Sequence, residues 1–357
     1  MSLVLEGVDR TVGGEVYLND INLTFERGEF NVLLGLTEAG KTTMMRIMAG
    51  LEPPSRGRVV EDGQDVTHVP VRKRSVGMVY QQFINYPSLS VYDNIASPLK
   101  LAGFSKSEID RLVRTEAERL GIDHLIDRLP SELSGGQQQR CAMARALVRD
   151  AKLVLLDEPL VNLDYKLREG LRSELRSLFA DRDTVVVYAT TEPEEALVLG
   201  GNTTVLHEGR VIQNGVTAQC YRHPANTTVT QVFADPPMNL MPVEIADGQI
   251  KAEGLLSAPL PEHMKDLAPG HYTLGIRPHH LFVTAGEGRI GLRGTVEVAE
   301  IAGSVTYVHL EVNGRDWVIE ERGVHQVHPG ERFELFMDLT RAYAFDSADQ
   351  LAAAPHS

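Results

Sequence analysis

The octapeptide LSGGQQQR, residues 133–140, lies between a glycine-rich loop, GLTEAGKT (35–42), and an apolar strand that ends in two acids, LVLLDEP (153–159). The loop alone indicates nucleotide binding, and the acidic strand end alone says little. A Ser-Gly-Gly helix start adds a second helix N-terminus that favours anions, because its free backbone N–H groups and the helix dipole attract negative charge. Together the three stretches predict an α/β nucleotide-binding domain that lends one anion site to a neighbouring chain.

Size and composition set limits on the class of protein. The 357 residues suffice for two domains with separate cores, and 43% apolar and 24% charged residues are ordinary for a globular protein. With 35 basic and 49 acidic residues, the net charge of −14 disfavours broad binding to nucleic acid. Two cysteines cannot form a disulfide framework and fit a reducing compartment. The sequence shows neither a signal peptide nor an apolar run near the ~20 residues that span a bilayer, so we expect no membrane-crossing segment.

Strand and helix patterns alternate over the first two thirds of the chain, which predicts an α/β layered domain. Ser105 and Glu108 form a capping box ahead of one apolar helical face. We expect buried strands at 30–35, 76–80, 152–157 and 184–190, and helices at 41–49, 105–120, 134–149 and 165–180.

The composition changes after about residue 235. The proline-rich stretch DPPMNLMP (235–242) ends any helix, and short alternating strands follow it. Turn signals such as Asp247-Gly248 and Asn313-Gly314 separate these strands. We therefore expect a nucleotide-binding domain at 1–235 and a small all-β barrel or sandwich at 236–357.

The glycine-rich loop has the context of a phosphate-binding loop, because it follows a strand and precedes a helix. Lys41 supplies a charge for the phosphates, and the Thr42 hydroxyl can coordinate Mg²⁺. A glycine turn with an exposed lysine is the alternative that these flanks disfavour. The predicted nucleotide contacts are Gly35, Leu36, Thr37, Glu38, Ala39, Gly40, Lys41, Thr42 and Thr43.

The acidic strand end predicts the metal site. We expect the strand that ends at Asp157 to lie beside the strand of the phosphate loop, where its carboxylate would hold Mg²⁺ directly or through water. Glu158 comes next and is the candidate to polarise the attacking water. An acid pair that serves solubility alone is the alternative reading.

The motifs in this order resemble an ATP-binding-cassette (ABC) ATPase, and the resemblance covers most of the chain. MVYQ (78–81) resembles the glutamine loop, and NLDYKLR (162–168) resembles the segment that contacts the opposite monomer. MNLMPVEI (238–245) and LGIRPHHL (274–281) resemble the regulatory domain of sugar- and polyol-importing members.

This resemblance implies a P-loop ATPase domain with a helical subdomain at about 82–150, followed by an OB-like regulatory barrel. It implies ATP and Mg²⁺ as cofactors, two transmembrane permeases, a periplasmic solute-binding protein reached through the complex, and a peripheral place on the cytoplasmic face of the bacterial inner membrane. Phe83, Ile84, Tyr86 and Tyr92 would either line the groove for a permease helix or pack within the helical subdomain. The implied roles are catalytic for Glu158, Gln81 and Thr191, metal-binding for Thr42, Gln81 and Asp157, and contact with the partner's ATP for Ser134, Gly135, Gly136 and Gln137.

Two stretches are similar to one of two non-identical ATPases of bacterial glycerol importers. They are VYQQFINYPSLSVYDNIASP (79–98) and YATTEPEEALVLGGNT (188–203). The expectation is half of an asymmetric ATPase heterodimer that drives glycerol import. A catalytically weak subunit that mainly completes its partner's site, and a homodimeric importer ATPase for another carbohydrate, remain as alternatives.

The chain departs from the family pattern at four positions. Thr191 stands where the family has a γ-phosphate-contacting histidine, a loss that costs about 2.7–4 kcal/mol of transition-state stabilisation. Val12 replaces the aromatic residue that stacks on adenine, with Tyr17 as a possible substitute, and Val161 replaces a serine. Glu38 replaces a glycine; a carboxylate ~6 Å from the phosphates costs about 3 kcal/mol at a dielectric of ~20, so we expect it to point outward.

Soluble ABC-type ATPases of DNA repair and of translation share the nucleotide-binding motifs. DNA-repair members carry long coiled-coil insertions and translation members carry two cassettes, and this chain has neither. A regulatory module whose C-terminal domain senses a metabolite or an inhibitory protein is a second rival. Oligonucleotide binding by the barrel is disfavoured by the acidic charge.

Overall fold

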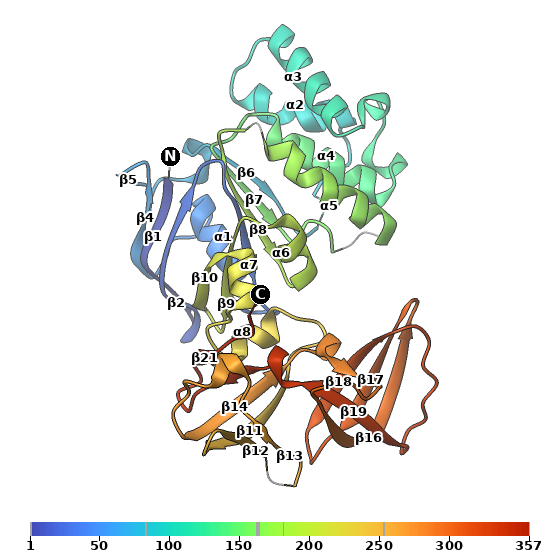
Figure 1. Cartoon of the computed structure of the whole chain (residues 1–357). Helices are drawn as coiled ribbons and strands as arrows, with labels where there is room; N and C mark the ends of the chain where they lie inside the picture. Colours follow the sequence, from blue (N-terminus) through green and yellow to red (C-terminus); the bar gives the residue numbers. More distant parts are fainter. Residues whose placement is uncertain (1, 83, 162–164, 181, 253, 357) are drawn as a thin grey trace. The chain divides into compact units, whose positions relative to one another are not determined.

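The computed structural model of the chain describes residues 2–82, 84–161, 165–180, 182–252 and 254–356. The chain divides into two compact units, Met1–Thr217 and Ala218–Ser357 (Figure 1). The first unit holds the motifs for nucleotide binding, and the second is rich in strands.

A six-stranded sheet forms the centre of the first unit, in the order β10-β9-β3-β8-β7-β6. Strand β10 is antiparallel to its neighbour, and the other pairings are parallel. Strands β3, β7 and β8 are buried along their whole length, which suits apolar strands covered on both faces. The bounds are β3 (Phe30–Leu34), β6 (Val76–Val79), β7 (Leu153–Asp157), β8 (Val185–Thr190), β9 (Asn202–His207) and β10 (Arg210–Val216).

The strand that ends at Asp157 does not lie beside the strand of the phosphate loop, so that expectation was wrong. Strand β8 separates them: Val186 pairs with Phe30 of β3 on one side and with Val154 of β7 on the other. An all-apolar strand pattern reports burial on both faces, but it carries no information on which strand is its neighbour.

An antiparallel sheet, β2-β1-β4-β5, forms a second layer of this unit. Its strands are β1 (Ser2–Val12), β2 (Glu15–Glu26), β4 (Arg56–Glu61) and β5 (Gln64–Asp65). Helix α1 (Lys41–Ala49) shares one apolar core with both sheets, since Met44 and Met48 cluster with Leu5 and Leu155. The helix that follows the phosphate loop is therefore buried.

Helices α2 (Val91–Leu101), α3 (Lys106–Arg119) and α4 (Gly135–Leu147) pack together as the predicted helical subdomain (Figure 1). The capping box of Ser105 and Glu108 begins α3 as expected. The far end of α4 lies directly on β6, because a Cβ on Gly77 would be 2.4 Å from the carbonyl oxygen of Ala146. Short 3-10 turns lie at Val71–Lys73, Asp123–Leu125 and Pro130–Glu132, and the remaining helices of the unit are α5 (Tyr165–Ala180) and α6 (Pro193–Leu199).

The second unit starts with the short helices α7 (Thr217–Arg222) and α8 (Thr227–Val232) and continues as an all-β, barrel-like domain. Its sheets run β13-β12-β11-β14-β20-β21 and β15-β19-β16-β17-β18, with antiparallel pairings. The strands are β11 (Asn239–Ala246), β12 (Gln249–Ala252), β13 (Leu256–Pro259), β14 (Gly270–Ile276), β15 (Leu281–Phe282), β16 (Arg289–Ala302), β17 (Val305–Glu311), β18 (Asp316–Arg322), β19 (Arg332–Asp338), β20 (Tyr343–Phe345) and β21 (Leu351–Ala353), with 3-10 turns at Glu262–Met264, Pro278–His280 and Leu339–Arg341.

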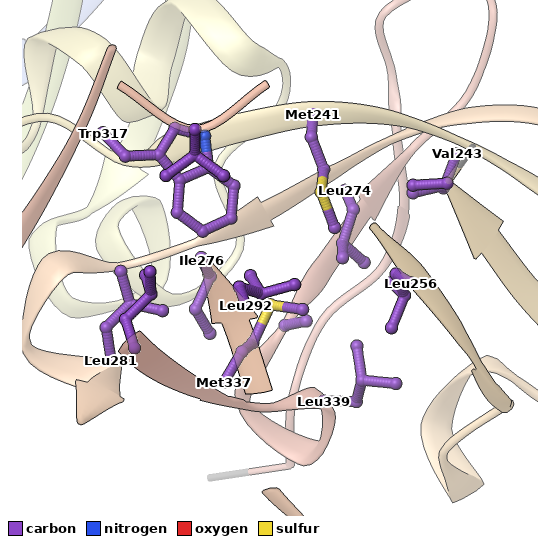
Figure 2. Close-up of a cluster of buried hydrophobic side chains, with 14 of the residues drawn as sticks. Met241, Val243, Leu256, Leu274, Ile276, Leu281, Leu292, Trp317, Met337 and Leu339 are labelled. Atoms are coloured by element: carbon purple, nitrogen blue, oxygen red, sulfur yellow. The ribbon is translucent and has the colours of Figure 1, made fainter. Parts of the chain in front are cut away.

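One apolar core joins the two sheets of this unit. Figure 2 shows Trp317, Leu274, Met241 and Met337 turned toward a common interior. The turn residues between the strands adopt left-handed conformations, with Asn313 and Gly314 at φ of 51° and 72°. Positive φ at both central residues is the signature of a tight hairpin turn, so the predicted hairpin is confirmed.

Among the residues that the structure describes, no helix combines the length and the apolar character that a membrane span requires.

Candidate nucleotide-binding site

The phosphate loop is held where only glycine fits. Gly40 has a φ of 101°, and a Cβ there would lie 2.8 Å from the carbonyl oxygen of Tyr17. A Cβ on Gly35 would lie 2.6 Å from the carbonyl oxygen of Leu206. The loop therefore touches the backbones of β2 and β9, and its helix α1 begins without a side-chain cap. The first-turn N–H groups remain available to an anion.

Lys41 is 5% exposed and reaches back over the loop. Its Nζ donates to the carbonyl oxygens of Gly35 at 2.8 Å and Leu36 at 3.0 Å, and lies 3.3 Å from Glu158 Oε1. Burial lowers the pKa of the Lys41 ammonium, and the charge of Glu158 opposes that shift. The charged amine is thus placed at the mouth of the loop with one carboxylate beside it.

Asp157 and Thr42 form a metal-type donor set. Asp157 is 4% exposed, and its Oδ1 accepts a hydrogen bond from Thr42 Oγ1 at 3.1 Å. Burial raises the pKa of the Asp157 carboxyl, while the bond from Thr42 opposes that shift. A hydroxyl and a buried carboxylate fit Mg²⁺, which takes few protein oxygens and completes its shell with phosphate and water.

Glu158 is held from three sides. Its φ of 44° is left-handed, its backbone N–H donates to the carbonyl oxygen of Ala189 at 3.0 Å, and its Oε2 accepts from Gln81 Nε2 at 3.2 Å. Its other oxygen faces Lys41. The structure thus brings together Lys41, Gln81 and Glu158, which lie far apart in the sequence.

Thr191 follows directly on the last residue of β8 and is half-buried. The carbonyl oxygen of the preceding residue, Thr190, accepts the N–H of Gly35 at 3.4 Å, so this strand end lies against the start of the phosphate loop. Threonine offers no imidazole there. The structure therefore places residue 191 at the edge of the sheet where the loop begins.

The sequence motifs do not single out two residues at this strand end, Thr190 and Glu195. Glu195 of α6 is 3% exposed and accepts hydrogen bonds from Tyr188 and Thr190. In the sequence it looks like the neighbouring Glu194, which is exposed. Its only available signal was helical spacing, because Glu195, Ala196 and Leu199 fall on one side of the helix.

The two glycines of the LSGGQ stretch, Gly135 and Gly136, form the start of α4. The Ser134 side chain accepts the N–H of Gln137 at 3.4 Å, and Gln137 Oε1 accepts the N–H of Ser134 at 3.0 Å. A Cβ on Gly135 would meet no atom within 4 Å, so the backbone is open on that side. These residues belong to the helical subdomain, whereas the phosphate loop lies between the two sheets.

Tyr17 and Val12 are surface residues of the first hairpin, 39% and 49% exposed. The Tyr17 hydroxyl donates to Glu15 at 3.0 Å, and that bond, with the nearby carboxylate charge, raises the pKa of Tyr17. Glu38 is exposed and has a φ of 68°, a conformation that glycine adopts without strain.

Ile84 and Tyr86, expected to line the permease groove, are exposed, and Tyr92 is half-buried. The Arg145 guanidinium lies over the Tyr86 ring at 4.9 Å. Phe83 and residues 162–164 of the segment NLDYKLR lie outside the described residues. Val161 is 36% exposed.

A mostly parallel sheet with an antiparallel second layer (Figure 1), together with a phosphate loop and a buried metal-type acid, defines an ABC-type ATPase domain. The family model described as "ABC transporter" matches residues 18–161, and the model described as "TOBE domain" matches residues 274–345. Among solved structures, a dimeric bacterial ABC transporter cassette, MJ0796, has a TM-score of 0.55 at 28% identity and covers 60% of this chain and 98% of its own. CbiO1 of Clostridium perfringens has a TM-score of 0.57 at 29% identity and covers 61% and 90%.

Relatives match over nearly the whole chain. The trehalose/maltose import ATP-binding protein MalK of Thermococcus litoralis is 38% identical over 94% of this chain and 95% of its own. The maltose/maltodextrin MalK of Yersinia pestis is 35% identical over 96% and 95%, and the alpha-glucoside transport protein AglK of Rhizobium meliloti is 36% identical over 98% of both chains.

The chain belongs to the MalK-like family of ABC importer ATPases. As a member of that family it binds ATP with Mg²⁺ and hydrolyses ATP. Importer ATPases of this family are peripheral proteins on the cytoplasmic side of the inner membrane, and they work with transmembrane permeases and a solute-binding protein.

Proposed function

We propose that the residues gathered around Glu158 hydrolyse ATP to energise import of a small carbohydrate or polyol. Lys41 and the loop N–H groups would bind the phosphates, and Thr42, Asp157 and Gln81 would hold Mg²⁺, which when bound would neutralise negative charge on the phosphates. Glu158 orients and polarises the attacking water. The observation that carries this proposal is the Glu158 carboxylate held between Lys41 and Gln81, beside the buried pair of Asp157 and Thr42.

Completion of the site requires a second chain. The residues Ser134 to Gln137 present a capped helix N-terminus with an open backbone face at Gly135. Such an end binds an anion, and we assign it to the ATP of an opposing ATPase subunit. Tyr17, exposed on the hairpin that contacts Gly40, is the residue we assign to stacking on adenine.

We further propose that the opposing subunit is not identical to this one. Residue 191 stands where a histidine would stabilise charge developing on the γ-phosphate, and threonine is too short to do so. A homodimer would carry this loss in both sites, whereas a heterodimer confines it to one. We propose glycerol as the imported substrate, because residues 79–98 and 188–203 resemble an ATPase of bacterial glycerol importers.

The curated relatives support a second candidate. They are named for import of maltose, maltodextrin, trehalose and alpha-glucosides, and they match at 35–38% identity. Those names favour an ATPase for import of a carbohydrate other than glycerol, and we pair this second candidate with a homodimer of the chain. Purification of the chain from its native membrane distinguishes the two, because the heterodimer brings a second cassette protein and glycerol uptake, and the homodimer does not.

Replacement of Thr191 by histidine tests the assignment of the weak site. A regained contact raises the turnover of the full-length chain by about a hundred- to a thousandfold, from the 2.7–4 kcal/mol that one such donor supplies. Glu158→Gln in the same background is the control, since it removes the proposed water-orienting carboxylate. Brisk, cooperative turnover by the wild-type chain alone, unchanged in Thr191→His, would contradict an impaired site.

The exposed side chains of Ile84 and Tyr86 support a docking role for the segment after Gln81. We propose that a cytoplasmic helix of a permease binds there, so that Gln81 connects the metal site to the transport pathway. The regulatory domain is proposed to begin at residue 236, with the helical subdomain at about 82–150.

A further inference from the structure

Glu195 is a buried acid that the proposed chemistry does not use. It lies in the first turn of α6 and is 3% exposed, whereas its neighbour Glu194 is exposed. One of its oxygens, Oε2, accepts the hydroxyl of Tyr188 at 2.8 Å and the hydroxyl of Thr190 at 2.6 Å. The exposed Glu194 already places an acid in the first turn of the helix, so interaction with the helix dipole does not by itself require a second, buried acid.

The Thr190 hydroxyl is used twice. It donates to Glu195 and accepts the backbone N–H of Glu192 at 3.0 Å. These two bonds fix the turn 190–192, which carries Thr191. The turn that carries Thr191 is thus held by one hydroxyl group and a buried carboxylate, together with the bond from the Glu195 N–H to the carbonyl oxygen of Glu192 at 3.2 Å.

The same strand end holds the other two parts of the site. The carbonyl oxygen of Ala189 accepts the N–H of Glu158, and the carbonyl oxygen of Thr190 accepts the N–H of Gly35. Because β8 lies between β3 and β7, its last two residues connect the phosphate loop to the proposed water-orienting acid. A shift of this strand end moves both.

We propose that Thr190 and Glu195 are positioning residues for ATP hydrolysis: they fix the end of β8 so that Glu158, Gly35 and residue 191 keep their relative places. Both residues are buried, 2% and 3% exposed, so we assign them no direct contact with the nucleotide. Tyr188 supports Glu195 from within the core and contributes less, because its loss leaves the bond between Thr190 and Glu195 intact. This inference rests on the proposed role of Glu158.

Thr190→Val tests the proposal, since valine keeps the shape of threonine and removes the hydroxyl. A misplaced catalytic group typically costs up to about a hundredfold in rate, so kcat of the assembled transporter falls by about tenfold or more while KM for ATP changes less than about twofold. Thr190→Ser retains the hydroxyl and keeps at least about half of the wild-type kcat.

Thr184→Val is the matched control. Thr184 precedes the other end of β8, is 2% exposed, and donates to the carbonyl oxygen of Ala151 at 2.7 Å. Its loss lowers the melting temperature and leaves kcat within about twofold. Hydrogen exchange on the full-length chain gives a readout without turnover: the amides of Gly35 and Glu158 exchange faster in Thr190→Val alone.

Equal kcat values for Thr190→Val and Thr184→Val, with unchanged exchange at Gly35 and Glu158, would overturn the inference. A fall in kcat that Thr190→Ser does not rescue would do the same. Glu158→Gln measured in parallel separates the two proposals. If it stays active, the proposed function fails; if it is inactive while the two valine variants behave alike, only the positioning role fails.

Discussion

Helices α1 and α4 both begin at a glycine-rich turn, yet their N-termini differ. The N-terminus of α1 follows Gly40 and has no side-chain cap. That of α4 is closed by Ser134 and Gln137, which satisfy each other's backbone N–H groups. The backbone N–H groups of an uncapped end are left for water or a ligand, whereas a capped end satisfies part of them within the chain. The difference suggests that α1 serves the chain's own nucleotide and α4 presents a preformed surface to another chain.

Removal of the charge at α1 has the largest expected effect. At ~4 Å and an effective dielectric of ~20, a unit charge pair is worth about 4 kcal/mol, so Lys41→Ala weakens ATP binding by about a thousandfold. Nucleotide titration of the full-length chain measures this. Lys100→Ala is the control, because Lys100 is exposed and paired with Asp93. Similar affinities in the two variants would remove Lys41 from the phosphate site.

Removal of the N-cap of α4 is expected to have a different effect from the change at α1. Ser134→Ala costs about 1 kcal/mol of stability, as is usual for a lost N-cap, and leaves ATP binding by the isolated chain unchanged. Turnover of the assembled transporter falls. Ser90→Ala is the matched control, since Ser90 caps α2 by accepting the N–H of Asp93 at 3.1 Å. Weaker ATP binding by isolated Ser134→Ala would assign α4 to the chain's own site instead.

Glu38 sharpens the comparison at the loop of α1. Its left-handed backbone costs about 1–2 kcal/mol, and glycine's extra freedom in the unfolded chain offsets about 0.5–1 kcal/mol, so Glu38→Gly stabilises the protein slightly. It also removes a carboxylate and tightens ATP binding. Glu208→Gly relieves the same kind of strain at a φ of 46° and is expected to leave ATP affinity unchanged. If both variants bind ATP equally, the charge of Glu38 does not reach the nucleotide.

Asp157 gives the smallest expected signal, a change in the pH dependence of stability. Burial raises its pKa in the folded state, so the folded protein binds the proton more tightly than the unfolded chain does. Its contribution to stability therefore falls as pH rises from the ordinary carboxyl value through the raised one. Asp157→Asn lacks this fall and is more stable at neutral pH without nucleotide. Denaturant unfolding across acidic to neutral pH checks it; identical profiles would mean that Asp157 is not destabilising.

Much of the architecture followed from local pattern. The bounds of α1 and α5 and the capping box of α3 agree with apolar spacing and cap residues, because these signals act within a few turns of one helix. The order of the strands did not follow, since β3, β7 and β8 are equally apolar and their neighbours are chosen by tertiary packing.

The site divides in the same way. The motif residues Lys41, Asp157 and Glu158 could be named from the sequence, because their chemistry is tied to a strand or helix end. Glu195 could not, since its role depends on a hydroxyl across the turn and not on any local pattern. Only the packing of α6 against the sheet shows that Glu195 is buried while the neighbouring Glu194 is exposed.

The close contact between Gly77 of β6 and Ala146 near the C-terminus of α4 fixes one end of this helix against the sheet. With no side chain between the two backbones, the C-terminal part of the helix lies directly against the strand there. Some twelve residues separate Ala146 from Ser134, which is about 18 Å along the helix axis. A tilt of ~5° about the contact would therefore move the N-terminus of α4 by roughly 1.5 Å. A bulkier residue at position 77 would push α4 away from β6 and change the angle at which Ser134 and Gly135 are presented to a facing subunit.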